Sequence, residues 1–554
     1  MSTSVFKTDI AQNIFYQKYA LSNNQTWEEK SYDIVEDVCG SMWGRRRKIL
    51  SQMEREQLVR YISEMKFIPG GRYIYYAKRR SHFWNNCLLL KAEEDTREEW
   101  AALAQRSTAA LMSGAGIGID YSILRHKGLL LSRTGGISSG PLSLMYMINE
   151  IGRNVMQGGS RRSAIYASLS WKHHDVYDFL RSKDWSQIPL SGTSITVADM
   201  KKNDFNYAAP LDMTNISINY DDDFLTSKDL PSIFIKNVRN ALMNGEPGFS
   251  FNFGDKQNET LRNACTEVTS EDDSDICNLG SINFARIEDI TELKDVVYLA
   301  SKFLVCGSMR ADVPYQKVAD VRERNRRLGL GVMGLHEWML RRGYKYEMNE
   351  ELKQWLQVYK KYSEVGANEH CDRFYLARPK GYRAIAPTGT TGLIASTTTG
   401  IEPLFSVAYK RRYLVGSDDW RYEYVIDSTA QHLIEELGVD PDTIETSLDL
   451  AADPERRIKF QADVQEYVDH AISSTINLPA WGTELNNEDT VKPFADLLRK
   501  YAPKLRGFTC YPDGSRGGQP LTSVPYSEAY GKTGTIYSEH DICEITGHGG
   551  SCGI

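Results

Sequence analysis

Apolar and charged positions follow a helical period through the first 80 residues of the chain. In EDVCGSMWGRRRKILSQMEREQLVRYISEM (36–65), apolar residues recur at the spacing of amphipathic helices. Further along, helical stretches alternate with short runs rich in β-branched residues. The predicted helices are 98–112, 141–157, 229–244, 291–305, 350–375 and 427–437, and the predicted strands are 163–170, 193–198, 214–220 and 382–386. This strand–helix alternation predicts a single α/β sheet or barrel.

The pattern divides the chain into three expected regions. They are an N-terminal helical region (1–80), an α/β domain (81–525) and a Gly-rich tail (526–554). The tail shows neither helical nor strand periodicity, which is typical of a mobile terminal segment.

Composition narrows the class of protein. The chain has 554 residues, 41% of them hydrophobic, and a formal net charge of -7. With this negative net charge, the composition gives no indication of a basic surface that would bind nucleic acid or an anionic membrane. No apolar run approaches the roughly 20 residues that span a bilayer, and MSTSVFKTDIAQNIFYQ lacks the layout of a signal peptide. We therefore expect a soluble, cytoplasmic protein.

Two glycine patterns need an interpretation. GAGIGID (114–120) has a glycine at every second position, which fits a tight approach of its backbone to another group but does not identify a ligand. GLGVMG (329–334) matches the dinucleotide-binding pattern, but RERNRR precedes it where a strand would be required. We interpret the glycines of GLGVMG as permitting close helix packing.

The segment RNACTEVTSEDDSDICNLGS (262–281) carries the candidate chemistry. Asn263, Cys265 and Glu267 fall at i, i+2 and i+4, so an extended backbone would place them on one face. A hydrolytic cysteine would need a nearby histidine, and none occurs between His174 and His336. The triplet suits a thiol that carries a hydrogen atom, beside a carboxylate that accepts a proton. A polar loop with a chance cysteine is the alternative interpretation.

NACTE followed by CNLGSIN resembles the catalytic segment of ribonucleotide reductases, which replace a ribose 2′-hydroxyl by hydrogen. Other motifs resemble the same family in the same order, from about residue 65 to the C-terminus. They are NNCLLL (85–90), GAGIGIDYSILR (114–125), RTGGISSG (133–140), QGGSRRSA (157–164) and APTGTTGLIASTTTGIEPLFSVAYKRR (386–412).

The resemblance implies a role for each residue of the candidate site. Cys265 would be the thiyl radical that abstracts the ribose 3′-hydrogen. Glu267 would take the 3′-hydroxyl proton, and Asn263 would hold the substrate hydroxyls. Cys87 and Cys277 would supply two electrons and become a disulfide.

Further residues are expected to bind substrate or to renew the thiols. The expected substrate contacts are Asn86, Gly116, Pro387, Thr388, Gly389, Thr390 and Thr391, of which 387–391 resemble a phosphate-binding loop. A simple threonine N-cap is the alternative for this loop. Cys543 and Cys552 of the tail would reduce the disulfide and be recharged by thioredoxin or glutaredoxin. With His540 and His548 they form an alternative zinc site, and no other metal site is expected.

The resemblance is greatest to class II enzymes, whose radical comes from adenosylcobalamin. Another class receives the radical from a ferritin-like di-metal subunit through two adjacent tyrosines, and here that pair is broken by Cys510 beside Tyr511. The usual class II sequence NPCGE differs at Ala264 and Thr266. A metal-bearing partner subunit that uses Tyr511 as a radical relay is therefore the alternative.

The family fold is a ten-stranded α/β barrel of two antiparallel five-stranded halves, with Cys265 on a central finger loop. We expect the compact form without an ATP-cone domain, and a homodimer. A deoxynucleotide or ATP effector would bind near Asp95 and Arg125 and the loops 133–140 and 158–163. A non-radical thiol–disulfide oxidoreductase or a nucleotide-binding protein is the alternative of another class. The choice between diphosphate and triphosphate substrates stays open.

Overall fold

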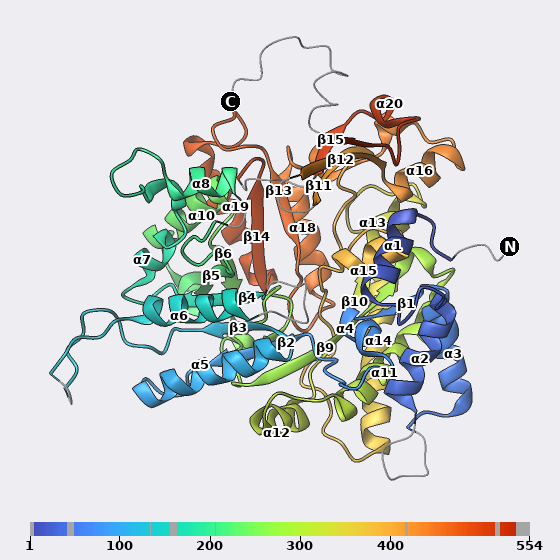
Figure 1. The fold of residues 1–554 in the computed structure, drawn as a ribbon, viewed down its shortest axis with the longest axis horizontal. Helices are drawn as coiled ribbons and strands as arrows, with labels where there is room; N and C mark the ends of the chain where they lie inside the picture. Colours follow the sequence, from blue (N-terminus) through green and yellow to red (C-terminus); the bar gives the residue numbers. More distant parts are fainter. Residues whose placement is uncertain are drawn as a thin grey trace.

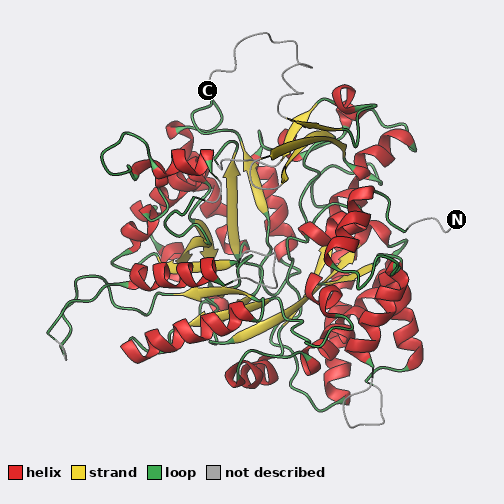
Figure 2. Ribbon diagram, in the orientation of Figure 1, coloured by secondary structure: helices red, strands yellow, loops and turns green. Residues whose placement is uncertain are grey.

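The computed structural model describes residues 5–40, 49–132, 135–155, 163–204, 207–415, 419–515 and 521–538. Within these ranges, no helix combines the length and the apolar character required to cross a membrane. Helices surround a central set of strands (Figure 1, Figure 2).

Five parallel strands form the first half of the central sheet. They are β2 (Cys87–Lys91), β3 (Gly116–Asp120), β4 (Ile165–Ser170), β5 (Thr214–Tyr220) and β6 (Gly248–Phe251), paired in that order. Their parallel course requires crossover connections, which carry helices. These helices are α5 (Arg97–Met112), α6 (Pro141–Asn154), α7 (Val176–Arg181), η1 (Trp185–Gln187), α8 (Val197–Asn203), α9 (Asp222–Thr226) and α10 (Ser232–Asn244).

The second half contains four strands and one bridged segment. The strands are β9 (Asp275–Asn283), β10 (Leu328–Met333), β13 (Thr475–Leu478) and β14 (Gly507–Pro512). β9 runs parallel to β10, and β13 runs parallel to β14. Between these pairs, parallel bridges join Leu330 to Arg383 and Ile385 to Ile472.

Helices also connect the strands of this half. They are η3 (Phe284–Arg286), α11 (Ile290–Arg310), α12 (Gln316–Asn325), α13 (Leu335–Leu340), α14 (Glu350–Arg373), α15 (Gly389–Ala395), α16 (Ser428–Glu435), η4 (Pro441–Thr443), α17 (Ser447–Leu450), α18 (Pro454–Gln465), α19 (Glu488–Tyr501) and η5 (Ala502–Lys504).

The two halves meet antiparallel and close a barrel. β9 pairs antiparallel with β2, and β14 pairs antiparallel with β6. With the bridged segment counted, each half supplies five of the ten positions in the ring. The predicted barrel of two antiparallel five-stranded halves is therefore confirmed.

Four helices and a short strand precede the barrel. They are α1 (Asp9–Lys18), α2 (Trp27–Cys39), α3 (Gln52–Ser63), β1 (Phe67–Pro69) and α4 (Gly71–Tyr76). Capping boxes at Thr26 and Ser51 fix the starts of α2 and α3. Apolar residues of these helices share one buried core with α11, α14 and β10. A second core lies between the first half of the barrel, α18 and α19.

A small antiparallel sheet lies beside the barrel near its C-terminal end. Its strands are β15 (Leu521–Val524), β11 (Ala408–Val415), β12 (Asp419–Ile426) and β16 (Ile536–Ser538), in that order, and α20 (Tyr526–Ala529) follows β15. Residues 526–538, expected as the start of a mobile tail, thus form α20 and β16. β16 pairs antiparallel with β12 in the register of Tyr537 with Tyr422.

The predicted strand at 193–198 is wrong. Thr196 caps α8, whose capping box is completed by Asp199. This local hydrogen bonding outweighs the β-propensity of the segment TSITVA. The interpretation of GLGVMG as a helix-packing site is also wrong, because residues 329–333 belong to β10 and Gly334 caps α13. Gly331 allows the backbone of Ala384 to approach closely.

A finger loop between β6 and β9 enters the barrel. It begins after η2 (Gly254–Lys256), and its sides are β7 (Leu261–Arg262) and β8 (Thr269–Ser270), which pair antiparallel. The finger passes directly over Gly116 and Gly118 of β3. A Cβ on Gly118 would overlap the carbonyl oxygen of Arg262, and one on Gly116 would lie 3.0 Å from the Cβ of Ala264. The alternating glycines of GAGIGID therefore make room for the finger.

Gly118→Ala should lower the free energy of unfolding by about 3 kcal/mol, because neither backbone can move away without breaking strand pairing. The matched control is Gly507→Ala in β14, whose Cβ would make an ordinary 3.5 Å contact with Phe249. The control should lose less than about 1 kcal/mol. Urea denaturation measures both changes, and equal losses would show that the finger does not need this glycine.

Candidate active site

The finger tip lies inside the barrel and contacts both halves. On one side, Asn263 donates from Nδ2 to the Sγ of Cys87 at 2.9 Å, and the carbonyl of Ala264 accepts from Asn215 of β5 at 3.5 Å. On the other side, the carbonyl of Glu267 accepts from the backbone N–H of Ala471 at 2.8 Å. Contacts with both halves hold the tip in the barrel interior.

The tip is a turn and not the extended segment that the i, i+2, i+4 spacing suggested. The N–H of Thr266 donates to the carbonyl of Asn263 at 3.0 Å, and Thr266 has a φ of 71°. A β-branched residue rarely adopts this left-handed conformation, which costs about 1–2 kcal/mol. The turn leaves Cys265 exposed while Asn263 and Glu267 are buried.

Cys87 and Cys277 lie directly opposite each other on β2 and β9. Residues opposed in an antiparallel pair have Cα atoms about 4.5–5.5 Å apart, within the range that a disulfide spans. Because Asn263 also contacts Cys87, the structure brings the finger and this thiol pair together.

Burial controls the ionisation of these groups. It raises the pKa of Glu267 to about 7, and the amide of Asn263 partly opposes the shift. The Oε2 atom of Glu267 is buried and has no hydrogen-bond partner in the described part of the chain. Burial also raises the pKa values of Cys87 and Cys277 well above the ordinary thiol value, with a further contribution from Glu267. Both thiols are therefore protonated at neutral pH, and Glu267 is poised to exchange a proton.

Asn86 adjoins this cluster. Its N–H donates to the carbonyl of Cys277 at 3.3 Å, and its buried Oδ1 has no partner among the described residues. Its carbonyl accepts from the N–H of Gly116 at 3.0 Å. The amide of Asn86 is thus held next to Cys87 with its oxygen available.

The segment 387–391 forms the start of α15. Thr388 has a left-handed φ of 49°, and its hydroxyl accepts from the N–H of Gly400 at 2.9 Å. The hydroxyl of Thr391 donates to the carbonyl of Thr388 at 3.2 Å. Pro387 and Gly389 are exposed, and Thr390 is half-buried. The loop is therefore held from within, with its outer side accessible.

A cavity of about 300 Å³ adjoins α15. Among its lining residues are Thr397, Glu402, Asp427 and Asn477. Glu402 is paired with Arg457 at 2.6 Å, and burial raises the pKa of Asp427 to about 6. Hydroxyl and carboxyl groups thus dominate the polar part of the lining.

The chain matches the family described as "Ribonucleotide reductase, barrel domain" over residues 85–225, 232–361 and 378–511. It belongs to that family. It is also similar to a protein of Mycobacterium tuberculosis named "Vitamin B12-dependent ribonucleoside-diphosphate reductase", with 28% identity over 87% of this chain and 75% of that protein. A protein of the same name from Thermoplasma acidophilum is 25% identical over 83% and 65% of the respective chains.

The barrel also resembles a solved ribonucleotide reductase. The class Id alpha subunit of Actinobacillus ureae superposes with a TM-score of 0.69, over 92% of this chain and 97% of that one, at 15% identity. At this identity the likeness shows the fold alone.

The remaining residues predicted from the family resemblance are placed as follows. Asp95 and Arg125 bind each other, with Arg125 Nε 2.6 Å from Asp95 Oδ2. Cys510 is buried, and its Sγ faces the carbonyl of Ala241 in α10 at 3.6 Å. Tyr511 lies on the other face of β14, so these two neighbours point in opposite directions.

Part of the predicted site falls outside the described residues. Cys543 and Cys552, the histidines of the alternative zinc site, and parts of both effector loops (133–134 and 158–162) belong to that part. Where the structure describes the chain, no group of three or more His, Cys, Asp or Glu side chains could hold a metal ion.

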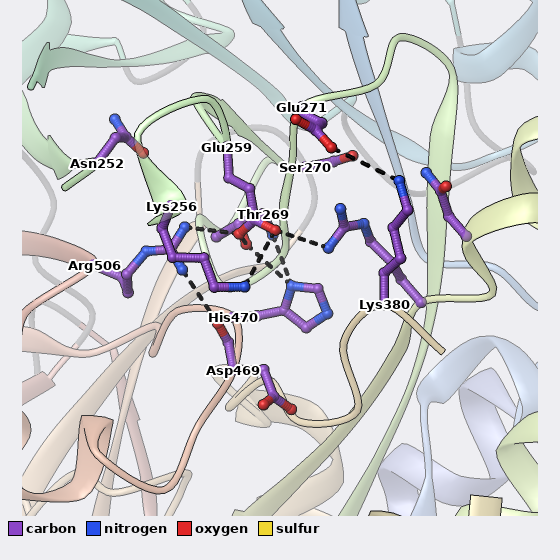
Figure 3. A network of polar contacts seen from close by, with 12 residues as sticks. Asn252, Lys256, Glu259, Thr269, Ser270, Glu271, Lys380, Asp469, His470 and Arg506 are labelled. Atoms are coloured by element: carbon purple, nitrogen blue, oxygen red, sulfur yellow. Dashed lines mark hydrogen bonds and ion pairs between the residues drawn. The ribbon is translucent and has the colours of Figure 1, made fainter. Parts of the chain in front are cut away.

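The sequence did not identify a buried polar network at the base of the finger. Figure 3 shows Glu259, Thr269, His470 and Arg506 pointing toward one another from separate segments. Only the density of arginines in RERNRR gave a signal, since Arg327 of this stretch joins the network. Glu259 and Thr269 lie 10 residues apart. His470 and Arg506 come from distant segments, and none of the four belongs to a local motif.

Proposed function

We propose that this chain reduces ribonucleotides to 2′-deoxyribonucleotides, with a thiyl radical at Cys265 and with Cys87 and Cys277 as the reductant. One observation carries the proposal: the finger residue Asn263 contacts Cys87, which faces Cys277 across β2 and β9. This contact brings the finger that carries Cys265 next to the two thiols, which supports the proposal in a member of the reductase family.

The proposed chemistry balances with these groups. Cys265 takes the 3′-hydrogen atom, and Glu267 accepts the 3′-hydroxyl proton. The 2′-hydroxyl leaves as water with a proton from the thiol pair. Cys87 and Cys277 supply two electrons and the hydrogen that C2′ gains, and they form a disulfide. Glu267 returns its proton to the 3′-oxygen, and Cys265 returns the hydrogen atom to C3′ and is again a thiyl radical. The raised thiol pKa values favour this role over that of a thiol–disulfide oxidoreductase, whose attacking group is a thiolate.

We propose adenosylcobalamin as the source of the radical. When bound, adenosylcobalamin would supply a radical by homolysis of its cobalt–carbon bond. The exposure of Cys265 at the finger tip fits this group. Cys510, which breaks the tyrosine pair of the alternative relay, is buried on the far side of β14 from Tyr511. The relatives from Mycobacterium tuberculosis and Thermoplasma acidophilum carry vitamin B12 in their names. A ferritin-like di-metal subunit with Tyr511 as relay is the alternative.

The substrate phosphates are proposed to bind at 387–391, with Asn86 and Gly116 nearer the ribose. The tail thiols Cys543 and Cys552 would reduce the Cys87–Cys277 disulfide and be recharged by thioredoxin or glutaredoxin.

A homodimer is supported by exposed apolar side chains on α6 and on the segment between β3 and α6, which projects from the barrel (Figure 1). They are Leu130 (76% exposed), Ile137 (67%) and Met147 (53%). The Asp95–Arg125 pair lies at the base of this projection, where a specificity effector would bind.

The purified chain should form deoxynucleotide from ribonucleotide when given adenosylcobalamin and a dithiol. Cys265→Ser should lower turnover by at least roughly 10³-fold, because an alcohol O–H bond is too strong to replace the thiol. Tyr511→Phe is the matched control and should keep turnover. Product from Cys265→Ser would contradict the radical assignment. Loss of turnover in Tyr511→Phe, together with wild-type product that forms only after a di-metal subunit is added, would contradict adenosylcobalamin as the radical source.

The rate should depend on the ionisation of Glu267. Its carboxylate is the proton acceptor, and its pKa is raised to about 7. Turnover should therefore rise from pH 6 to pH 8 and level off above, and Glu267→Gln should remove this limb together with most activity.

Thermal unfolding provides the control for this variant. The folded protein holds the Glu267 proton more tightly than the unfolded chain, whose value is near 4.5. Stability from this group is thus present at low pH and is lost as the pH rises through about 7. Glu267→Gln should unfold at a higher temperature than the wild type at pH 8 and at a similar temperature at pH 4. A rate that is flat between pH 6 and 8 would rule out this role.

A further inference from the structure

The two ends of the finger are joined through one carboxylate. Glu259 precedes β7, and its Oε2 accepts from the hydroxyl of Thr269 in β8 at 2.8 Å. The same oxygen accepts from Nη2 of Arg506 at 3.0 Å, and Oε1 accepts from Nη1 of Arg327 at 3.2 Å. Figure 3 shows this convergence at Glu259. A single side chain thus ties the entry of the finger to its exit.

The two cations belong to the wall of the barrel. Arg327 immediately precedes β10, and Arg506 immediately precedes β14. Arg327 also donates from Nε to Asp275, the first residue of β9, at 2.8 Å, and Ser270 donates to the same carboxylate at 2.6 Å. The base of the finger is therefore fixed to the starts of three strands.

The segment that binds Thr269 at the exit of the finger also binds Glu267. The N–H of Thr269 donates to Nδ1 of His470 at 3.3 Å, and the next residue, Ala471, donates to the carbonyl of Glu267 at 2.8 Å. The segment that holds Thr269 thus also holds Glu267. A displacement of Thr269 would be passed to Glu267 two residues away.

These charges are buried and do not titrate near neutral pH. Glu259 is 8% exposed and Arg327 is 2% exposed. Burial acts to raise the pKa of Glu259, but Arg506 and Arg327 together hold it below its usual range. Burial lowers the pKa of His470 to about 3, so that the ring is neutral and can accept from Thr269. Buried ion pairs add little stability over apolar residues of the same size. Their hydrogen bonds, however, fix the orientation of the bonded side chains, which apolar contacts do not.

We propose that Glu259 is a positioning residue for ribonucleotide reduction: by clamping Thr269 to Arg327 and Arg506, it fixes Glu267 and Cys265 relative to the substrate. This inference rests on the function proposed above for the relation to turnover. The positioning of Glu267 can be measured independently of turnover.

Thr269→Val keeps the shape of the side chain and removes the hydroxyl that Glu259 binds. It should lower kcat about 10²-fold with KM little changed, because a shift of about 1 Å in a reacting group has such an effect. Thr269→Ser keeps the hydroxyl and should stay close to the wild type. Thr429→Val is the matched control, since the Thr429 hydroxyl also bonds a buried carboxylate, that of Glu337, at 3.3 Å.

The second readout is the titration of Glu267, obtained from the pH dependence of unfolding in each protein with and without Glu267→Gln. In Thr269→Val the pKa should fall from about 7 toward the ordinary value of 4.5, because Glu267 leaves its buried position. Thr269→Ser and Thr429→Val should leave it near 7. This readout needs no turnover, so it decides the clamp even if the chain reduces no ribonucleotide.

Arg506→Lys perturbs the clamp from the other side and covers the case in which Thr269→Val does not fold. It keeps the cation but not the guanidinium geometry, and should shift kcat and the Glu267 titration in the same direction. An unchanged titration in both variants would overturn the proposal. An equal loss of kcat in Thr429→Val would overturn it as well, since any buried threonine would then have the same effect.

Discussion

Cys87 and Cys277 face each other because β2 and β9 run antiparallel in one register. A slip of one residue would turn one of the thiols to the other face of the sheet. β2 begins the first half of the barrel and β9 begins the second, so their pairing is also one of the two seams that join the halves; the other is β6 with β14. The pairing that places the dithiol therefore also closes one seam of the barrel.

The position of the finger depends on two further constraints, one steric and one ionic. Gly116 and Gly118 let the finger lie against β3, where a Cβ on Gly118 would overlap the finger backbone and one on Gly116 would crowd Ala264. Glu259 and its arginines then fix the base to the strand starts. Between these supports the tip turns at Thr266, whose strained conformation exposes Cys265. The site combines a buried carboxyl, two protonated thiols and an accessible third thiol, and this combination suits radical chemistry better than thiolate chemistry.

The sequence predicted the features that depend on local pattern. The helices around 98–112 and 350–375 and the strand 214–220 were recognised because each has its own period and end signals. The family resemblance supplied the barrel, which periodicity alone did not distinguish from an open sheet. Cys265 and Glu267 were singled out by residue type and spacing, although the backbone between them proved to be a turn.

Features that depend on distant contacts were not predictable in this way. Glu259 and Arg506 are 247 residues apart, and nothing in either neighbourhood indicates the other. The strand predicted at 193–198 failed because a capping box overrode β-propensity. β15 and β16 were missed because each is short and pairs with a remote strand, whereas β11 and β12 form a local hairpin that the sequence analysis did not identify.

The most direct measurement follows the thiols through one turnover without external reductant. Cys543→Ser with Cys552→Ser prevents exchange with the tail, and peptide mass spectrometry after alkylation identifies the oxidised pair. The account predicts one Cys87–Cys277 disulfide for each deoxynucleotide formed. Deoxynucleotide formation with both cysteines still open to alkylation would contradict it.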